Sequence, residues 1–181
     1  MDTKILSVRD ICSIGIFTAV ITVCAQLSIP MPYGVPLTLQ TFAIPLAGVI
    51  LGAKKGAIST LIYILLGAAG IPVFAGFTGG LGIVIGPTGG FIFSFPLMAI
   101  TAGVGESKSN RVWLVFWLVL GTALNYLCGM FFFSLVMSSS LKTAFAVCVL
   151  PFIPTGIIKI ALVAVCGRMI KRALAESGVL I

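Results

Sequence analysis

Residues 112–136 read VWLVFWLVLGTALNYLCGMFFFSLV, a run of roughly 25 residues that contains no charged side chain. A transmembrane helix needs about 20 consecutive, mostly apolar residues, because each residue advances the helix by about 1.5 Å and the hydrocarbon core of a bilayer is about 30 Å thick. This run is long enough by itself. It predicts that the chain crosses a membrane.

The composition extends this prediction to the whole chain. Of 181 residues, 60% are hydrophobic and 8% are charged, whereas soluble domains carry about 25% charged residues. No polar stretch is long enough for a second domain, so we expect residues 1–181 to form one integral membrane domain. Glycine, proline and charged residues divide the chain into six apolar segments, at residues 11–29, 39–51, 56–69, 89–103, 112–136 and 144–167. The predicted fold class is an all-α membrane protein, a bundle of six transmembrane helices.

The basic residues predict the orientation of this bundle. Most of them precede the first segment, lie in alternate connections or follow the last segment: Lys4, Arg9, Lys54, Lys55, Lys108, Arg111, Arg168, Lys171 and Arg172. Six crossings place all of these on one side, which the positive-inside rule makes cytoplasmic. We therefore expect a multi-pass protein of the cell membrane with both termini in the cytoplasm. Nucleic acid is not an expected partner despite the net charge of +7, because the basic residues share no face.

Two connections on the predicted outer side are unusual. Residues 30–38 and 70–88 contain no charged residue and are rich in glycine and proline. They are too apolar for solvated linkers and too rich in glycine for stable helices. We expect these glycine-rich extracellular-side loops to pack as a lid or as the wall of a cavity.

The second of these loops contains a short repeat. GFTGG at residues 76–80 recurs as GPTGG at residues 86–90. A phosphate-binding loop needs Gly-Lys-Ser/Thr after the glycines, and no basic residue follows before Lys108. Two interpretations remain: close approach of the backbone to a ligand, with the Thr78 and Thr88 hydroxyls available, or close packing of helices.

Lys159 gives the clearest functional signal. It lies inside the last apolar segment, where a central lysine costs about 2.5–3.5 kcal/mol on insertion scales. All four acidic residues of the chain are assigned to the cytoplasmic side, so an internal salt bridge is not expected. The remaining partners are backbone carbonyls freed by Pro151 and Pro154, water reached by snorkelling, or an anionic or carbonyl-bearing ligand. We favour the ligand, because ionisable residues inside membranes are functional by default.

Two amides and three aromatic residues complete the candidate site. Gln40 and Asn125 are predicted at membrane depth, and an amide both donates and accepts, as recognition of a urea-like or amide-like group requires. Either amide could equally join two helices. Phe74, Phe77 and Phe91 offer the apolar wall that ligand pockets need, although aromatic residues also form belts at membrane interfaces.

The residues present give little support to an enzyme. There is no histidine and no carboxylate at the predicted membrane depth, so neither an acid–base pair nor a metal cluster is available. The five cysteines show no C-x-x-C spacing. We therefore expect no catalytic residue, no metal and no cofactor, and a binding or transport role remains.

A pair of small residues stands out in the first segment. Gly15 and Ala19 are four residues apart, and Cys12 extends the same face. Such a pair allows close contact between helices. The contact could lie within this chain or with a partner.

Three stretches carry a resemblance to a known family: VPLTLQTFAIPLAGVILGAKKGA at residues 35–57, YILLGAAGIPVFAGFTGGLGIVIGPTGGF at 63–91 and PFIPTGIIKIAL at 151–162. They closely resemble the BioY family, the biotin-binding S components of energy-coupling factor (ECF) transporters, over nearly the whole chain. The resemblance implies biotin uptake through a pocket on the extracellular side. It also implies partners: biotin, a transmembrane ECF coupling subunit that contacts Gly15 and Ala19, and two cytoplasmic ATPases.

By the same matching, several residues fall on the family's binding motifs. With the candidates above, the predicted substrate-binding set is Thr38, Gln40, Phe74, Phe77, Gly79, Thr88, Phe91, Asn125 and Lys159. Two positions depart from the family pattern. Many relatives have Gly-Asp where this chain has Thr155 and Gly156, and Phe91 replaces a frequent tyrosine. Without that carboxylate, Lys159 is freer to meet a carboxylate or ureido oxygen of the ligand.

These inferences predict a substrate-binding transporter subunit and not an enzyme, with ATP hydrolysis on partner chains. Three alternatives stay open: an S component for another vitamin, a solitary biotin facilitator that needs no ATPase, and a purely structural membrane partner.

Overall fold

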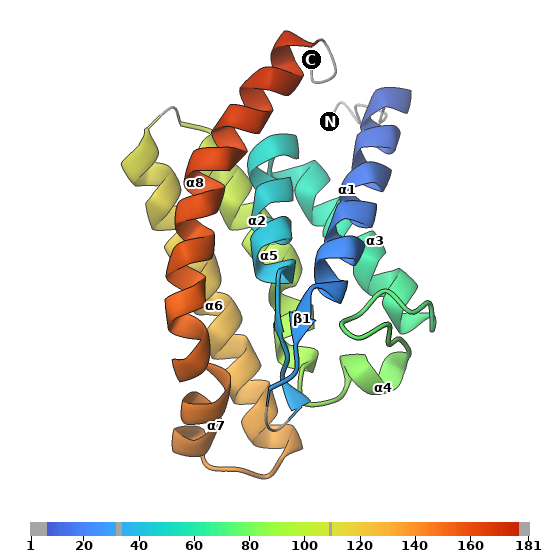
Figure 1. Ribbon diagram of the computed structural model, residues 1–181, viewed down its shortest axis with the longest axis vertical. Coiled ribbons are helices and arrows are strands. Elements are labelled where there is room, and N and C mark those ends of the chain that lie inside the picture. Colours follow the sequence, from blue (N-terminus) through green and yellow to red (C-terminus); the bar gives the residue numbers. More distant parts are fainter. Residues whose placement is uncertain (1–6, 32–33, 109, 178–181) are drawn as a thin grey trace, which may run out of the picture.

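The structure is a computed structural model in which residues 7–31, 34–108 and 110–177 are described; Lys4 lies outside them. Long helices run along the molecule, and shorter helices and loops complete it (Figure 1). The long helices are α1 Val8–Gln26, α5 Gly89–Glu106, α6 Arg111–Val136 and α8 Ile153–Glu176. The shorter helices are α2 Gln40–Leu51, α3 Ala53–Ala68, α4 Leu81–Val84 and α7 Leu141–Cys148.

The helices suit a lipid environment. Within the described chain, 4 stretches are long and apolar enough to cross a membrane, namely α1, α5, α6 and the region from α7 through α8. The outward faces carry large apolar side chains such as Ile16, Phe116 and Ile157, each more than half exposed. Lipid tails are as apolar as these side chains, so the exposed faces need no protein cover. The prediction of a mostly helical, multi-pass membrane protein is confirmed.

The last predicted segment is broken into two helices. We expected one apolar segment at residues 144–167, but α7 ends at Cys148 and a 3-10 helix covers Leu150–Phe152 before α8 begins. Pro151 and Pro154 account for the break, because proline has no N–H donor and its ring clashes with the preceding turn of a regular helix. The break places the start of α8 beside the interior of the bundle.

The first predicted segment ends before residue 29, because a small β-ribbon follows α1. β1, Ser28–Ile29, pairs antiparallel with β2, Leu37–Thr38. The amide of Leu39 also donates to the Leu27 carbonyl at 3.2 Å. The all-α prediction missed this ribbon, which holds the extended segment before α2 against the end of α1.

α5 is the central helix and packs against α6, α2 and α3. Small residues bring the backbones together. A Cβ added at Gly48 of α2 would lie 2.1 Å from the Ala99 carbonyl oxygen of α5, and one added at Gly103 would lie 2.2 Å from the Ala53 nitrogen. Helices in lipid associate through such close van der Waals packing, since the tails supply no hydrophobic force between them.

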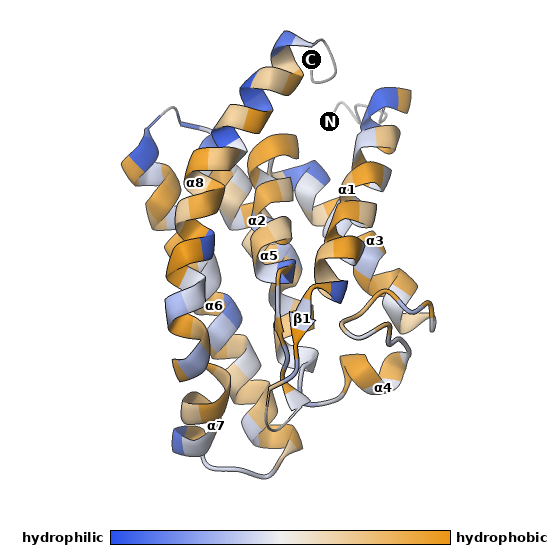
Figure 2. Ribbon diagram, in the orientation of Figure 1, coloured by the Kyte–Doolittle hydropathy of each residue, from blue (hydrophilic) through white to orange (hydrophobic). Residues whose placement is uncertain are grey.

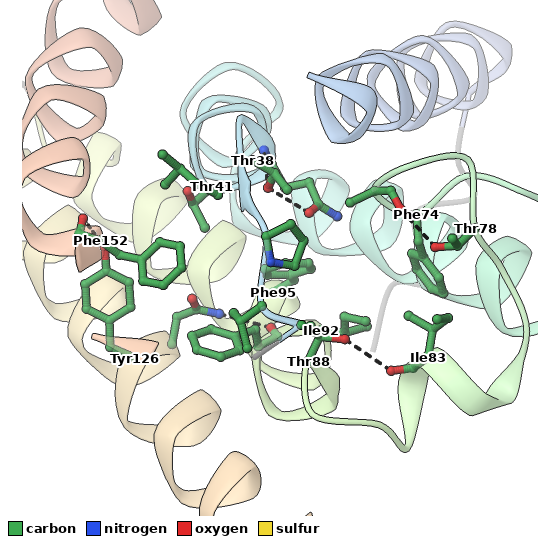
Figure 3. Close-up of a pocket in the computed structure, with 18 of the residues that line it drawn as sticks. Thr38, Thr41, Phe74, Thr78, Ile83, Thr88, Ile92, Phe95, Tyr126 and Phe152 are labelled. Carbon is green, nitrogen blue, oxygen red and sulfur yellow. Dashed lines mark hydrogen bonds between the residues drawn. The ribbon is translucent and has the colours of Figure 1, made fainter. Parts of the chain in front are cut away.

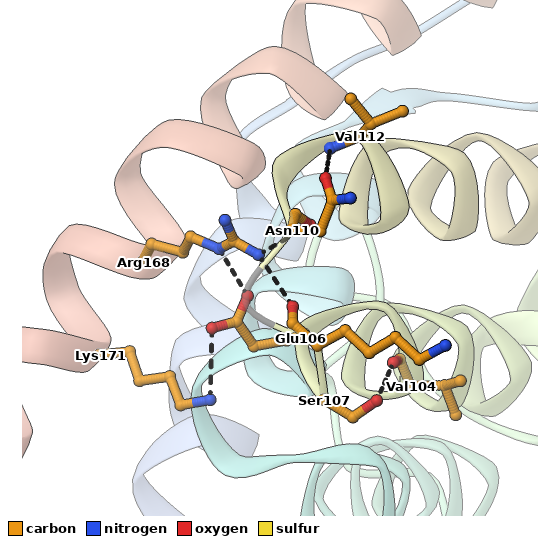
Figure 4. A network of polar contacts seen from close by, with 8 residues as sticks. Val104, Glu106, Ser107, Asn110, Val112, Arg168 and Lys171 are labelled. Atoms are coloured by element: carbon orange, nitrogen blue, oxygen red, sulfur yellow. Dashed lines mark hydrogen bonds and ion pairs between the residues drawn. The ribbon is translucent and has the colours of Figure 1, made fainter.

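Charged side chains gather where α1 begins and α8 ends, which we call the basic end (Figure 2). Here Lys55 of α3 forms an ion pair with Asp10 of α1. Glu106 at the end of α5 accepts from Nε of Arg168 at 2.8 Å and from Nζ of Lys171 at 3.4 Å (Figure 4). These pairs join α1 to α3 and α5 to α8 outside the apolar middle of the bundle.

Replacement of Gly48 by alanine should destabilise the bundle. The added methyl group must push α2 away from the Ala99 carbonyl, and overpacking of this kind costs about 1–3 kcal/mol. We expect a lower thermal unfolding temperature for Gly48→Ala in detergent. Gly15→Ala is the matched control, because an added Cβ there meets nothing within 4 Å; equal shifts for both variants would contradict the close α2–α5 contact.

Candidate functional site

A cavity of about 240 Å³ lies among the side chains drawn in Figure 3. The β-ribbon and the loop after α3, which flank it, lie in the half of the molecule away from the basic end (Figure 1). Its wall is formed by residues 34–38, the loop after α3, the middle of α6, the first turns of α2 and α5, and two residues from the start of the α8 region, Phe152 and Lys159. The helices α2, α5 and α8 each run from the cavity to the basic end. Because the N-terminus of a helix carries a partial positive charge, the first turns of α2 and α5 beside the cavity favour an anionic group in it.

Lys159 brings a cation to this wall from the second turn of α8. Its side chain is 8% exposed, and Nζ donates to the Thr38 carbonyl oxygen at 2.6 Å and to Oγ1 of Thr41 at 2.8 Å. The backbone carbonyl that accepts from Lys159 is therefore that of Thr38, and not one of the carbonyls that we expected Pro151 and Pro154 to free. None of the ion pairs among the described residues involves Lys159. An ammonium group has three N–H donors, so one donor remains for a ligand.

Gln40 lines the cavity but has partners for both of its polar atoms. Its Oε1 accepts from the Thr38 hydroxyl at 2.8 Å, and its Nε2 donates to the hydroxyl of Tyr63 at 2.6 Å. Tyr63 belongs to α3 and is fully buried. The Gln40 amide thus joins the start of α2 to α3 and fixes the segment whose carbonyl holds Lys159.

Asn125 of α6 is the second amide on the wall, and one of its atoms lacks a partner. The side chain is fully buried, and Nδ2 donates to the Phe91 carbonyl at 3.0 Å and to the Ser94 hydroxyl at 2.7 Å. Its Oδ1 is buried without a hydrogen-bond donor among the described residues. Leaving a buried acceptor unpaired costs about 1–3 kcal/mol. An N–H group of a ligand in the cavity would satisfy this oxygen.

The apolar part of the wall is largely aromatic. Phe74, Phe91, Phe95 and Phe152 are buried around the cavity. Tyr126 lies beside them, and its hydroxyl donates to the Phe152 carbonyl at 3.0 Å (Figure 3). A pocket of this kind, with flat rings and a few convergent polar groups, suits a mostly apolar ligand with polar ends.

The cavity brings together most of the predicted substrate-binding residues: Thr38, Gln40, Phe74, Thr88, Phe91, Asn125 and Lys159. Phe77 and Gly79 lie outside its lining. The Phe77 side chain is 73% exposed. Gly79 packs against the backbone of its own loop, where an added Cβ would lie 2.5 Å from the Ile71 carbonyl oxygen. Gly90 of the second GxTGG repeat packs against α6, since a Cβ there would lie 2.4 Å from the Cys128 carbonyl oxygen.

The predicted partner-binding pair lies on the outer face of α1. Gly15 and Ala19 are both exposed, and an added Cβ at Gly15 would meet no atom of the described chain within 4 Å. Close packing against another described helix therefore does not explain the pair.

Several wall residues were not singled out from the sequence, among them Thr41, Phe95, Tyr126 and Phe152. Phe95 had a usable signal, because it follows Phe91 by four residues and so shares its helix face. No sequence signal pointed to Thr41. Its contact with Lys159 depends on where the extended chain changes to helix, at residues 38–40.

Comparisons with known proteins agree with this geometry. A sequence model of the BioY family matches residues 1–176. The chain belongs to the BioY family. The probable biotin transporter BioY of Pyrococcus horikoshii is 39% identical to it over 166 residues, which cover 92% of this chain and 98% of the relative. The biotin transporter BioY of Thermotoga maritima is 37% identical over 169 residues, 93% of this chain and 99% of the relative.

A solved structure extends the likeness to the fold. The crystal structure of the S-component for biotin from an ECF-type ABC transporter matches with a TM-score of 0.83 and 28% identity, covering 91% of this chain and 92% of that chain. The similarity thus includes the arrangement of helices that encloses the cavity.

The structure gives a packing reason for Thr155 and Gly156, the two residues of this BioY protein that stand where many relatives have Gly-Asp. A Cβ added at Gly156 would lie 2.6 Å from the Tyr126 hydroxyl oxygen. The Thr155 hydroxyl donates at 3.0 Å to the Phe152 carbonyl, the same acceptor that Tyr126 uses. Tyr126 therefore fills the space that a side chain at position 156 would enter.

The two amides on the wall should respond differently to leucine substitution in the ligand-free protein. Asn125→Leu removes an oxygen that has no partner, and both acceptors of its Nδ2 keep other bonds, because the Ser94 hydroxyl also donates to the Gly90 and Phe91 carbonyls. We therefore expect a smaller loss in the free energy of unfolding than for Gln40→Leu. Gln40→Leu leaves the buried Tyr63 and Thr38 hydroxyls without their amide partner, and we expect a loss of about 1–3 kcal/mol. Denaturant or thermal unfolding in detergent measures both, and greater destabilisation by Asn125→Leu would contradict the assignment of its free oxygen.

Proposed function

We propose that this BioY protein is the S component of a biotin uptake system, a substrate-binding membrane subunit and not an enzyme. Relatives that match over nearly their full length are biotin transporters, and the matching solved structure is an S component for biotin. The observation that carries the proposal is the cavity lined by both Lys159, whose ammonium keeps one donor, and Asn125, whose oxygen has no donor among the described residues.

The chemistry of biotin fits these groups. Biotin carries a carboxylate on a flexible chain, and a cyclic urea with N–H donors and a carbonyl acceptor on an apolar bicycle. The free oxygen of Asn125 accepts a ureido N–H, and the remaining donor of Lys159 meets an anionic or carbonyl oxygen. Phe74 and Phe91 cover the apolar rings. The amide of Gln40, whose atoms already have partners, holds Thr38 in place.

The remaining predicted residues complete the proposed site. The hydroxyl of Thr88 donates to the Ile83 carbonyl at 3.3 Å and keeps lone pairs for the ligand. Direct contact of Phe77 and Gly79 with the ligand stays a prediction, because both belong to the loop beside the cavity without lining it.

The proposed orientation places the basic end in the cytoplasm. Under the positive-inside rule, six crossings leave both termini inside the cell and the cavity with its glycine-rich loops on the extracellular side of the cell membrane. Gly15 and Ala19 then present a small-residue surface to the coupling subunit, and two ATPases on other chains supply the energy. The protein thus acts as a single substrate-binding domain of residues 1–181.

Purified protein should bind radiolabelled biotin, and Lys159→Met should weaken that binding. Methionine keeps the length of the side chain but removes the donor in the cavity. Losing one partner of a buried charged contact costs about 2–5 kcal/mol, so we expect the dissociation constant to rise by at least about 30-fold. Lys142→Met is the control, because Lys142 is an exposed lysine outside the cavity lining.

Two further experiments extend this binding measurement. Asn125→Leu should also weaken biotin binding while the protein stays folded, which separates ligand contact from stability. Competition with riboflavin and thiamine tests the vitamin: displacement of biotin by either one would indicate an S component with another substrate. Undiminished binding by Lys159→Met would refute the role of the lysine.

The outer face of α1 should matter for uptake but not for binding. Replacing Gly15 and Ala19 by leucine builds side chains onto the proposed docking surface. We expect uptake in cells that contain the coupling subunit and ATPases to fall to background, while biotin affinity of the purified variant stays within about twofold, since α1 is not part of the cavity lining.

Val23→Leu is the control on the same helix, because Val23 is 63% exposed and already large. Full uptake by the double variant would contradict docking at Gly15 and Ala19. Biotin uptake in cells without the coupling subunit would instead indicate a solitary facilitator.

A further inference from the structure

Gln26, the last residue of α1, is a polar side chain outside the cavity lining that makes an unusual set of contacts. Its Nε2 lies 3.3 Å from the Thr22 carbonyl oxygen, 3.2 Å from that of Val73 and 3.1 Å from that of Phe74. Its Oε1 accepts from the Phe77 amide at 2.8 Å. One side chain thus binds the backbone of a loop that lies 47 to 51 residues further along the chain.

The bound loop needs such support. Phe74 and Thr78 exchange backbone hydrogen bonds of 2.9 and 3.4 Å and close a tight turn. Within it, Gly76 and Phe77 adopt φ values of +70° and +56°, and the left-handed region costs a residue with a Cβ about 1–2 kcal/mol. Gln26 binds the amide of this strained Phe77. It also binds the Val73 carbonyl, which would otherwise need water beside an apolar wall.

This turn is part of the cavity wall. Phe74, Ala75 and Thr78 line the cavity. The Phe74 ring is 2% exposed and meets the ring of Tyr63 edge-on, with 5.5 Å between ring centres. An added Cβ at Gly67 would lie 2.2 Å from the Phe74 ring, so α3 leaves room for this ring through a glycine. The position of the turn therefore sets the shape of one side of the cavity.

The end of α1 also connects to the opposite side of the cavity. Through the β-ribbon, Ser28 pairs with Thr38, whose carbonyl holds Lys159. Figure 1 shows the end of α1 between this ribbon and the loop that follows α3. Both walls thus depend on where the end of α1 lies.

We infer that Gln26 is a positioning residue that holds the Phe74–Thr78 turn closed over the cavity and ties it to α1. A ligand then leaves only when the amide contacts of Gln26 break or the end of α1 moves with the turn. The inference rests on the proposed function in taking biotin as the ligand. The hold of Gln26 on the turn does not depend on which ligand binds.

The test compares wild type with Gln26→Met, Gln26→Glu and Thr22→Val. Methionine removes all amide contacts. Glutamate keeps the shape and the acceptor for Phe77, but places a second oxygen against the Val73 and Phe74 carbonyls. Thr22→Val is the matched control one turn earlier, because among the described residues the Thr22 hydroxyl bonds only to the Thr18 carbonyl of the same helix.

Two measurements read the outcome in detergent or nanodiscs. Hydrogen–deuterium exchange of the ligand-free protein should be faster at residues 71–79 in both Gln26 variants and unchanged in α5 and α6. Radiolabelled biotin should dissociate about tenfold faster or more from both, because several hydrogen bonds are lost, and within about twofold of wild type from Thr22→Val.

Wild-type behaviour of Gln26→Glu in both measurements would overturn the inference, because shape alone would then suffice. Equal effects of Thr22→Val and the Gln26 variants would also overturn it, since they would indicate general loosening of α1. If wild type bound no biotin, the proposed function would fail, and the exchange measurement would still decide the role of Gln26.

Discussion

The ammonium group of Lys159 joins the last long helix to the extended segment before α2 through the Thr38 carbonyl, and to the first turn of α2 through the Thr41 hydroxyl. A lysine at this depth is costly unless the protein supplies oxygen atoms to it. The need to place these oxygen atoms beside Lys159 constrains the surrounding structure. Leu37 and Thr38 must stay extended so that a backbone carbonyl is free to accept, and the β-ribbon and Gln40 hold them there.

Buried polar groups need hydrogen-bond partners, and this requirement distinguishes the amides that hold the fold together from the amide that can contact a ligand. Gln26 and Gln40 have partners within the chain for both polar atoms, and each links elements distant in sequence. Asn125 differs, because it lines the cavity and its oxygen has no donor among the described residues. A polar network that is complete rigidifies its surroundings, whereas an incomplete one marks a place where another molecule can bind. Gln26 and Gln40 therefore shape the cavity, whereas Asn125 is the amide that can bind the ligand.

The sequence predicted the parts of this structure that local chemistry determines. The uncharged run at residues 112–136 became α6, and Lys159 stood out because lysine is costly in an apolar segment. Seven of the nine predicted binding residues line one cavity. Thr41 and Gln26 could not be found this way, because their partners lie 118 and up to 51 residues away. The sequence also did not separate α7 from α8, because the apolar run continues through Pro151 in the 3-10 helix between them.

The charge balance of the cavity narrows the class of ligand further. Among the described residues, Lys159 has no carboxylate partner, and the first turns of α2 and α5 add partial positive charge to the same wall. A cationic ligand such as thiamine would be repelled by every one of these groups, whereas an anion is attracted by all of them. A simple fatty acid would satisfy the charge and the aromatic wall but leave the oxygen of Asn125 unpaired. A ligand that satisfies every group must join an anionic or carbonyl oxygen to an N–H donor on one apolar body, and biotin has this combination.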